Sequence, residues 1–323
     1  MKISGLDTTD RELIAALDVD CQVSNTELAD LLGVTRQTVA NRLRQLGEEG
    51  VLTGFHTSIN PHRMGRRIFK LYLKLRNIPQ EKCVLLERLR SKPNVYWMGE
   101  CSGSWDVICA LYCENDFEFF QEKNSLLSEF TNIIVAESGG LLIDVLQFPK
   151  MWLTEDLHPP VTFAGKVVPN SLDLLDLGIL RELVADARTP AKKIAESLKS
   201  TTPTVLSRIE KLEQAQVIIQ YRVGVDLEKL GLQLYKAVMR FEQFSEEKEK
   251  AFRDYACQIP QLQYFIRDMW QYELEFVVTD FNHYSEIIDG IKREFPYLLR
   301  SIDTVLMLTD EWLPGAENLL VAD

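Results

Sequence analysis

Apolar residues recur at helical spacing near the start of the chain. Leu13 and Leu17 belong to an apolar stripe along one helix face. A second helix is expected to open at Ser24, which has the spacing of a capping box with Glu27, and to end at Gly33. A third helix then follows after a short turn. Two adjacent helices of this kind are typical of a helix-turn-helix.

The third helix lies in "GVTRQTVANRLRQL", which returns later in the chain as "KSTTPTVLSRIEKL". A shift of 166 residues superimposes Leu6 on Leu172 and Gly65 on Gly231 without a gap. One extra residue then brings "SWDV" onto "QYEL". An internal match of this length indicates that one two-part unit is written twice.

The first part of each unit ends in strand formers. Thr35 can cap the third helix, and Gly50 stands where that helix should stop. The stretches 51–59 and 217–225 are each expected to form two short strands with a turn between them, which makes a wing. Each first part is therefore predicted to be a winged helix-turn-helix domain.

The second part of each unit alternates strands and helices in the order β-α-β-β-α-β, which is that of a ferredoxin-like sandwich. In the first copy the strand patterns lie at 68–75, 94–100, 105–113 and 140–148, with one helix around 80–89. The second copy repeats this order. The chain is thus predicted to be an α+β protein with two winged helix-turn-helix domains, each followed by a ferredoxin-like domain.

The predicted domains are consecutive along the chain. The first helix-turn-helix spans 1–65 and the first ferredoxin-like domain 66–153, a proline-rich linker occupies 154–171, and the second pair spans 172–231 and 232–323. Two ferredoxin-like domains in one chain are expected to pair with each other. Further homo-oligomerisation through these domains is expected as well.

Charge and composition narrow the class of protein. The net charge is −12, of which −8 lies in 232–323, so wholesale non-specific binding of nucleic acid is unfavourable while local basic patches remain open. No apolar run has the length of a membrane span and no signal peptide opens the chain, so a cytoplasmic protein is expected. The six cysteines are scattered, which favours no metal or redox site, and no cofactor is predicted.

These residues resemble the leucine-responsive and asparagine-regulator (Lrp/AsnC) transcription factors. The signature is Leu6-Asp7 with Asp10, then "ELADLLGVTRQTVANRLRQL", then Gly50-Val51-Leu52 and Gly65. The resemblance implies double-stranded DNA as a partner and a ferredoxin-like domain that dimerises and binds a small effector such as an amino acid. The family also has a recurring Gly-x-x-Asp between the central strands of the ferredoxin-like domain. The second copy resembles the family less closely, because Trp270 and Glu273 align with the Gly and Asp of this motif.

The outward face of the third helix is expected to carry side chains of the types that read DNA. Gln37, Asn41 and Arg44 lie opposite the apolar side, and these residue types read base edges in the major groove. Arg36 and Arg42 flank the apolar side and suit phosphates. The predicted DNA-binding set is Arg36, Gln37, Thr38, Asn41, Arg42 and Arg44 with Thr204, Arg208 and Lys211. In the second copy Pro203, Ser207 and Glu210 take the outward positions, which predicts a weaker or non-specific reader.

The resemblance also points to a candidate effector site. The family's Gly-x-x-Asp matches "GSWD", so the candidate effector residues are Ser102, Gly103, Ser104 and Asp106. In this interpretation Asp106 holds an amino group. In the alternative, Gly103 forms a turn and Asp106 caps a strand.

Two other functions stay open. One is a scaffold or co-regulator that keeps the fold and barely touches DNA, which the acidity favours. The other is an enzyme similar to the siroheme decarboxylases, which share the two-part fold; Arg267 and Tyr272 match parts of their His-Asn-Tyr-x-Arg stretch, and Gln263 stands at the position of the histidine. No catalytic residue is predicted, because no imidazole is available there as acid or base.

Overall fold

The computed structural model describes residues 3, 5–313 and 319–320 of the chain. The elements of the first half are α1 (Thr8–Val19), α2 (Asn25–Leu32), α3 (Arg36–Glu48), β1 (Leu52–Ile59), η1 (Pro61–Met64), β2 (Arg67–Leu75), α4 (Pro79–Arg90), β3 (Val95–Gly103), β4 (Val107–Cys113), α5 (Asp116–Glu129), β5 (Ile134–Gln147), η2 (Met151–Leu153) and β6 (Val161–Ala164). Those of the second are α6 (Leu174–Ala185), α7 (Ala191–Ser197), α8 (Thr202–Gln214), β7 (Ile218–Val225), β8 (Gln233–Phe241), α9 (Glu246–Ala256), β9 (Leu262–Asp268), β10 (Tyr272–Val278), α10 (Phe281–Glu294), β11 (Leu299–Met307) and β12 (Glu311–Trp312).

Each half contains a four-stranded antiparallel sheet covered by two helices. The strand order is β5-β2-β4-β3 in the first half and β11-β8-β10-β9 in the second. With α4 and α5, or α9 and α10, between the strands, this is the predicted ferredoxin-like arrangement. Phe69 and Leu71 of β2 pack with Leu86 of α4 in one core, and Phe252 of α9 packs with Phe276 of β10 in the other. The two-part fold is confirmed in both copies.

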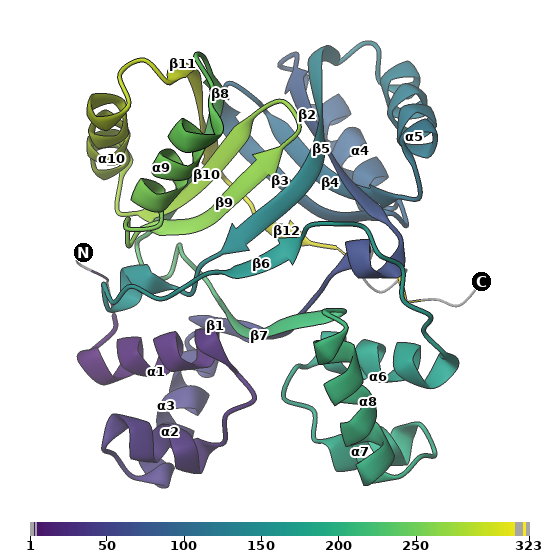
Figure 1. Ribbon diagram of the computed structural model, residues 1–323, viewed down its shortest axis with the longest axis vertical. Coiled ribbons are helices and arrows are strands. Elements are labelled where there is room, and N and C mark those ends of the chain that lie inside the picture. Colours follow the sequence, from purple (N-terminus) through teal and green to yellow (C-terminus); the bar gives the residue numbers. More distant parts are fainter. Residues whose placement is uncertain (1–2, 4, 314–318, 321–323) are drawn as a thin grey trace.

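The two sheets join edge to edge within one chain. Antiparallel pairing connects β5 to β9, with Val145 opposite Ile266, and β3 to β11, with Ser102 opposite Leu306. Eight strands therefore close into a ring, and helices α4, α5, α9 and α10 lie outside it (Figure 1). The predicted pairing of the two ferredoxin-like domains within one chain is confirmed. Joining these edges also removes unpaired strands that would otherwise invite aggregation.

The helix-turn-helix domains form as their caps predict. The Ser24 hydroxyl accepts the Glu27 N–H, and the Glu27 carboxylate accepts the Ser24 N–H. Gly33 ends α2 in the left-handed conformation, at a φ of 63°. The Thr35 hydroxyl accepts the Thr38 N–H at 3.1 Å and caps α3. These local signals fix the start of α3, the helix that carries the candidate DNA-reading face.

The predicted wings are wrong. The stretch 52–59 is one strand, β1, and its partner is β7 of the other copy, with Phe55 opposite Val223. The hydrogen bonds that a wing would have made inside one copy are instead made between the copies. A two-stranded ribbon therefore lies between the two helix-turn-helix domains, beneath the ring of strands (Figure 1).

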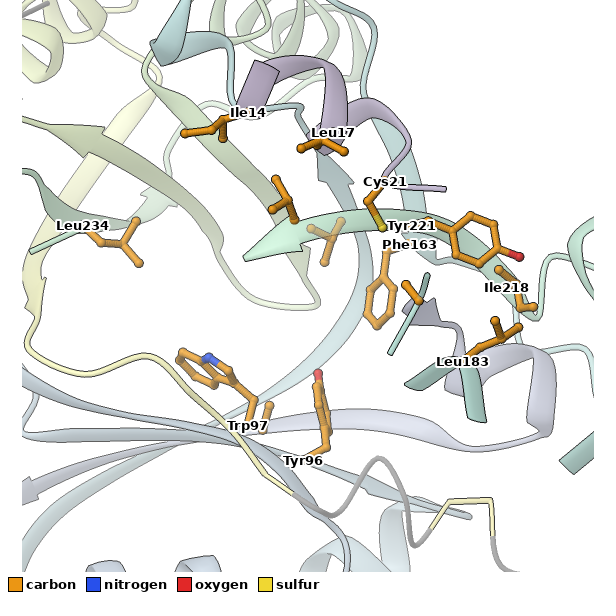
Figure 2. Packing of buried hydrophobic residues seen from close by; sticks show 14 of the residues in the cluster. Ile14, Leu17, Cys21, Tyr96, Trp97, Phe163, Leu183, Ile218, Tyr221 and Leu234 are labelled. Atoms are coloured by element: carbon orange, nitrogen blue, oxygen red, sulfur yellow. The ribbon is translucent and has the colours of Figure 1, made fainter. Parts of the chain in front are cut away.

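Each helix-turn-helix domain packs against the strand of the other copy. The Cys21 N–H after α1 donates to the Tyr221 carbonyl of β7, and the Ala187 N–H after α6 donates to the Phe55 carbonyl of β1, both at 3.1 Å. Ile14 and Leu17 of α1 belong to a cluster of buried apolar side chains that includes residues of β7, and Figure 2 shows them beside that strand. The exchange ties both domains to a single central ribbon.

A buried ionic network joins α1 of the first helix-turn-helix domain to β7. Asp18 of α1 is fully buried, and its carboxylate accepts from Arg222 of β7 at 2.7 Å and from Lys150 at 2.6 Å. Burial opposes ionisation of Asp18, but the two cations outweigh it and lower the pKa of the carboxyl. The equivalent residue in the second copy is Val184. The first domain is therefore anchored by ions where the second is anchored by apolar contact.

The segment predicted as a linker adds to the sheet. β6 lies inside 154–171 and pairs with the end of β5, with Phe163 opposite Val145. Cys109 and Cys113 lie on one face of β4 and are both buried on its helix side. Among the described residues, no helix is both long enough and apolar enough to cross a membrane.

Candidate nucleic-acid interface

The outward face of α3 is polar and open. Gln37, Asn41 and Arg44 are exposed, while Val39 and Leu46 on the opposite side are buried in the domain core. The Gln37 amide donates to the Asn41 side-chain oxygen at 3.0 Å. Within the described part of the chain, the Arg44 guanidinium has one ion pair, an exposed i,i+4 contact to Glu48 at 3.7 Å. The face is thus available for hydrogen bonds to base edges.

The remaining predicted residues of α3 differ in accessibility. Arg36 is exposed at the first turn, where the positive end of the helix dipole also favours phosphate. Thr38 is half-buried, and its hydroxyl lies 2.8 Å from that of Thr35 in the helix cap. Thr38 therefore supports the start of α3 and presents little of itself outward.

Arg42 and Arg208, both predicted as phosphate contacts, are each held by two carboxylates. Arg42 donates to Asp7 at 2.8 Å and to Asp10 at 2.6 Å. Arg208 makes the same contacts with the matching acids of the second copy, Asp173 at 2.8 Å and Asp176 at 3.0 Å.

The acids that hold these arginines are themselves caps. Asp7 and Asp10 form a capping box at the start of α1, and Asp173 and Asp176 form one at the start of α6. The Asp10 N–H makes the largest contribution to the pKa of Asp7; burial opposes it, and Arg42 adds to it, so the pKa is lowered. The Leu-Asp-x-x-Asp signature thus encodes a helix cap and a clamp for the reading helix.

The outward face of α8 has a different chemistry. Pro203, Ser207 and Glu210 are exposed, and Leu206 beside them is 54% exposed. Glu210 accepts from the amide of Gln214 at 3.1 Å. Thr204 and Lys211 are also exposed. This face offers an apolar group and a carboxylate where α3 offers amides and a guanidinium.

The candidate effector turn is partly committed to the fold. Both oxygens of Asp106 have partners: the Leu75 N–H at 2.7 Å and the Lys74 ammonium at 3.2 Å. A Cβ on Gly103, whose φ is +119°, would lie 2.5 Å from the Thr304 carbonyl oxygen of β11. The geometry agrees with the alternative in which Asp106 caps a strand. Ser102 and Ser104 are exposed.

The second copy has no counterpart of this turn. Six residues separate the paired Glu100 and Val107 in the first copy, and four separate Arg267 and Tyr272 in the second. The alignment of Glu273 with Asp106 is therefore wrong. Glu273 lies opposite Val238 just as Ile108 lies opposite Tyr72, so Ile108 is its structural equivalent.

Residues compared with the siroheme decarboxylases have structural partners. Gln263 is buried; it accepts from the Trp152 indole at 3.0 Å and donates to the Phe148 carbonyl at 2.8 Å. Arg267 pairs with Asp144 at 2.5 Å. Tyr272 stacks on Phe241 at 4.3 Å between ring centroids. These side chains hold the sheet together.

The sequence interpretation missed a group of buried charges between the two sheets. Lys70, Lys236, Glu273 and Glu275, called here the central ion cluster, are joined by contacts of 2.7 to 2.9 Å. Their signal was a charged residue on the inward face of an otherwise apolar strand, at the same position in both copies for the two lysines.

The fold and the exposed reading helix define a helix-turn-helix regulator of tandem construction. The AsnC-type helix-turn-helix domain matches residues 6–46 and again 172–213. The HTH-type transcriptional regulator Ptr1 of Methanocaldococcus jannaschii is 32% identical over 107 residues, which cover 32% of this chain and 70% of that protein. The chain belongs to the Lrp/AsnC family of transcription regulators.

Other comparisons agree on family and fold. The leucine-responsive regulatory protein of Rhizobium meliloti is 34% identical over 105 residues, which cover 32% of this chain and 65% of that protein. The crystal structure of the siroheme decarboxylase NirDL superimposes with a TM-score of 0.64 over 97% of each chain, at 11% identity. This second likeness shows that the whole tandem arrangement is a known fold.

Proposed function

We propose that this regulator binds double-stranded DNA in the cytoplasm, with α3 as the specific reader and α8 as a weaker contact. The observation that supports it most is the open face of Gln37, Asn41 and Arg44 within a matched helix-turn-helix domain. Amides favour adenine and guanidinium favours guanine in the major groove. The remaining exposed cation at the start of α3, Arg36, suits a phosphate.

The two readers imply an asymmetric target. Both helix-turn-helix domains lie at the same end of the molecule, on either side of the β1–β7 ribbon (Figure 1). Identical subunits of a symmetric dimer read two equal half-sites. Here Pro203, Ser207 and Glu210 replace the two amides and the guanidinium of the first reader, so the second half-site should differ from the first and contribute less discrimination. We therefore propose a non-palindromic operator.

Mapping of bound DNA across the genome, followed by salt-dependent shift assays on a recovered site, tests this proposal. Specific binding should weaken as salt rises, because counterions are released from each phosphate that the protein contacts. Lys250→Ala on α9, remote from both readers, is the matched control for Arg44→Ala, because each variant removes one exposed cation. No bound sites, together with no shift at low salt, would favour the scaffold alternative.

The fold shared with NirDL supports the enzyme alternative, but the side chains of Gln263, Arg267 and Tyr272 do not. Gln263 and Arg267 are occupied by structural contacts, and an amide cannot replace imidazole as an acid or base at neutral pH. We infer a regulator and not an enzyme. Incubation of the purified protein with siroheme tests this, and loss of carboxyl groups from the tetrapyrrole would overturn it.

An amino-acid effector stays a prediction. The turn at 102–106 presents two exposed serines, while Asp106 is already paired with Lys74 and the Leu75 N–H. Asp106→Ala should therefore lower the stability of the β3–β4 hairpin in addition to any effect on a ligand response. A thermal-shift screen with amino acids on wild type, Ser102→Ala and Asp106→Ala separates the two effects, because the transition without ligand reports stability and its shift with ligand reports the response.

A further inference from the structure

The central ion cluster lies where the two ferredoxin-like sheets face each other. Glu273 is fully buried and accepts from Lys70 of the first half at 2.7 Å and from Lys236 of its own half at 2.8 Å. Lys236 also contacts Glu275 at 2.9 Å. The Tyr72 hydroxyl donates to the second oxygen of Glu273. Each buried charge therefore has an opposite charge beside it.

The charges of the cluster balance only across the two halves. Desolvation opposes ionisation of Glu273, but the ammonium groups of Lys236 and Lys70 outweigh it and lower the pKa of its carboxyl to about 2. Burial alone would lower the pKa of Lys236, but Glu273 and Glu275 outweigh it and raise that pKa. Both groups are ionised at neutral pH. Burial lowers the pKa of Lys70, and Glu273 opposes this across a contact of 2.7 Å, so the charge of Lys70 depends on its partner in the other half.

The two sheets do not contribute equally to this balance. Lys70 and Lys236 occupy equivalent positions, since the two copies differ by 166 residues in these strands. The strand register makes Ile108 and Ala110 of the first half the equivalents of Glu273 and Glu275 of the second. Within the central ion cluster, the first sheet thus contributes a lysine and no acid, and the second contributes a lysine and two acids.

We propose that the central ion cluster makes each sheet select the other kind of sheet and reject a copy of itself. Two first sheets facing each other would bury two lysines without a carboxylate. Two second sheets would bury four carboxylates against two lysines. Uncompensated buried charge is strongly unfavourable, so only the pairing of unlike halves is neutral. The linker supplies proximity, and the cluster supplies the choice of partner.

Cysteine pairs in the full chain can report both pairings. Ser102 and Leu306 are opposite each other across the β3–β11 junction, so Ser102→Cys with Leu306→Cys should form a disulfide within one chain. Leu141 lies opposite Phe69 as Leu306 lies opposite Tyr235, so it is the equivalent of Leu306 in the first half.

Ser102→Cys with Leu141→Cys therefore reports the rejected pairing. These two cysteines meet only when first sheets of two different chains pair, and they then give a covalent dimer. Both reporters carry Cys83→Ser, which removes the exposed native thiol. Each protein is refolded under reducing conditions at several chain concentrations, oxidised, and examined on a non-reducing gel.

With the cluster intact, the first reporter should crosslink within the chain and the second should give almost no covalent dimer. Replacing the cluster by Lys70→Met, Lys236→Met, Glu273→Leu and Glu275→Leu should raise the covalent dimer of the second reporter at least tenfold, increasingly at higher chain concentration. Such apolar replacement of buried ions is often tolerated by the fold. Equal dimer fractions with and without the cluster would show that the linker alone decides, and would overturn the proposal.

A second variant retains the charges in case the apolar set does not fold. Ile108→Glu with Glu273→Ile gives each sheet one lysine and one acid, so like sheets become neutral as well. It should also increase the covalent dimer. Removal of an exposed ion pair on α9, by Lys250→Ala with Asp254→Ala, should leave the dimer fraction at the wild-type level. An increase in this control equal to that of the cluster variants would contradict the selection.

Discussion

The two halves of the molecule share their framework and differ in what that framework presents. Thr35 and Thr201 cap the two reading helices in the same way, and Arg42 and Arg208 are held by matching acids. The outward faces and the inward sheet faces have diverged. Duplication therefore left the parts that build each unit alike and allowed the contacting surfaces to become different.

This divergence turns a symmetric assembly into one with two distinct sides. In a dimer of identical chains every substitution appears twice. In this chain a carboxylate can enter one sheet to meet the lysines of both, as Glu273 does. The same freedom allows one reading helix to keep amides and guanidinium while the other loses them. The comparison can be tested at four places, taken from the largest expected effect to the smallest.

The largest effect is expected at the ionic anchor of α1. Asp18→Ala leaves Arg222 and Lys150 buried without their carboxylate, which should lower the free energy of unfolding by about 3–5 kcal/mol. Val184→Ala at the equivalent position is the control and should cost about 1 kcal/mol, because only part of an apolar contact is lost. Denaturant unfolding measures both. Equal losses would mean that the two anchors do not differ as described.

The second test concerns the β5–β9 junction. Asp268 is buried beside Gly140, and one of its oxygens has no hydrogen-bond partner among the described residues. Burial raises its pKa to about 7, the Trp270 N–H opposes this, Glu273 adds to it, and Lys70 opposes it. A carboxyl with a raised folded pKa binds its proton more tightly when folded, so stability falls as pH rises from about 4 to about 7.

Asp268→Asn should remove this dependence. Relative to the variant, the wild type should lose about 2–4 kcal/mol between pH 4 and pH 8. Cys101 takes the equivalent place in the β3–β11 junction, so Cys101→Ser is the control and should leave the pH profile unchanged in shape. A parallel profile for wild type and Asp268→Asn would show that Asp268 is ionised throughout.

The third test compares the two readers on one DNA at one salt concentration. Arg44→Ala should cost about 1–3 kcal/mol of discrimination if a guanine contact is lost. It should instead lower the salt slope by about one if a phosphate contact is lost. Glu210→Ala should leave affinity equal or slightly higher, because a carboxylate near phosphate is repulsive. Loss of binding in Glu210→Ala with no effect in Arg44→Ala would reverse the assignment.

The smallest test asks whether the shared framework is equally important in both copies. Thr35→Ala and Thr201→Ala each remove one cap, from the Thr38 N–H and the Thr204 N–H. Each should cost about 1 kcal/mol of stability. Thermal unfolding of the two variants should give similar shifts. A large difference would mean that one helix-turn-helix domain depends much less on its cap than the other.

Local features of the fold could be predicted from the sequence, because short-range rules govern them. The box at Ser24 and Glu27, the stop at Gly33 and the succession of strands and helices along each half all formed as expected. The pairing of β1 with β7 of the other copy, in place of two wings, could not be predicted. A strand former reports that a stretch is extended, and it does not say whether its partner is eight residues away or in the other copy.

The candidate site was predicted in part for the same reason. Helical periodicity was enough to place Gln37, Asn41 and Arg44 outside. It could not show that Arg42 reaches back 35 residues to Asp7, since that ion pair depends on how α1 packs on α3. The register of Glu273 was missed because a turn shorter by two residues moves a side chain along the strand without changing its face.

The exchanged ribbon has a consequence for the chain while it is being synthesised. β1 is complete at Ile59, and its partner β7 begins at Ile218. At roughly 5–20 residues per second, the first helix-turn-helix domain waits on the order of ten to thirty seconds for the strand against which it packs. During that interval β1 is an open edge, so crowded ribosomes translating one message would bring several such edges close together.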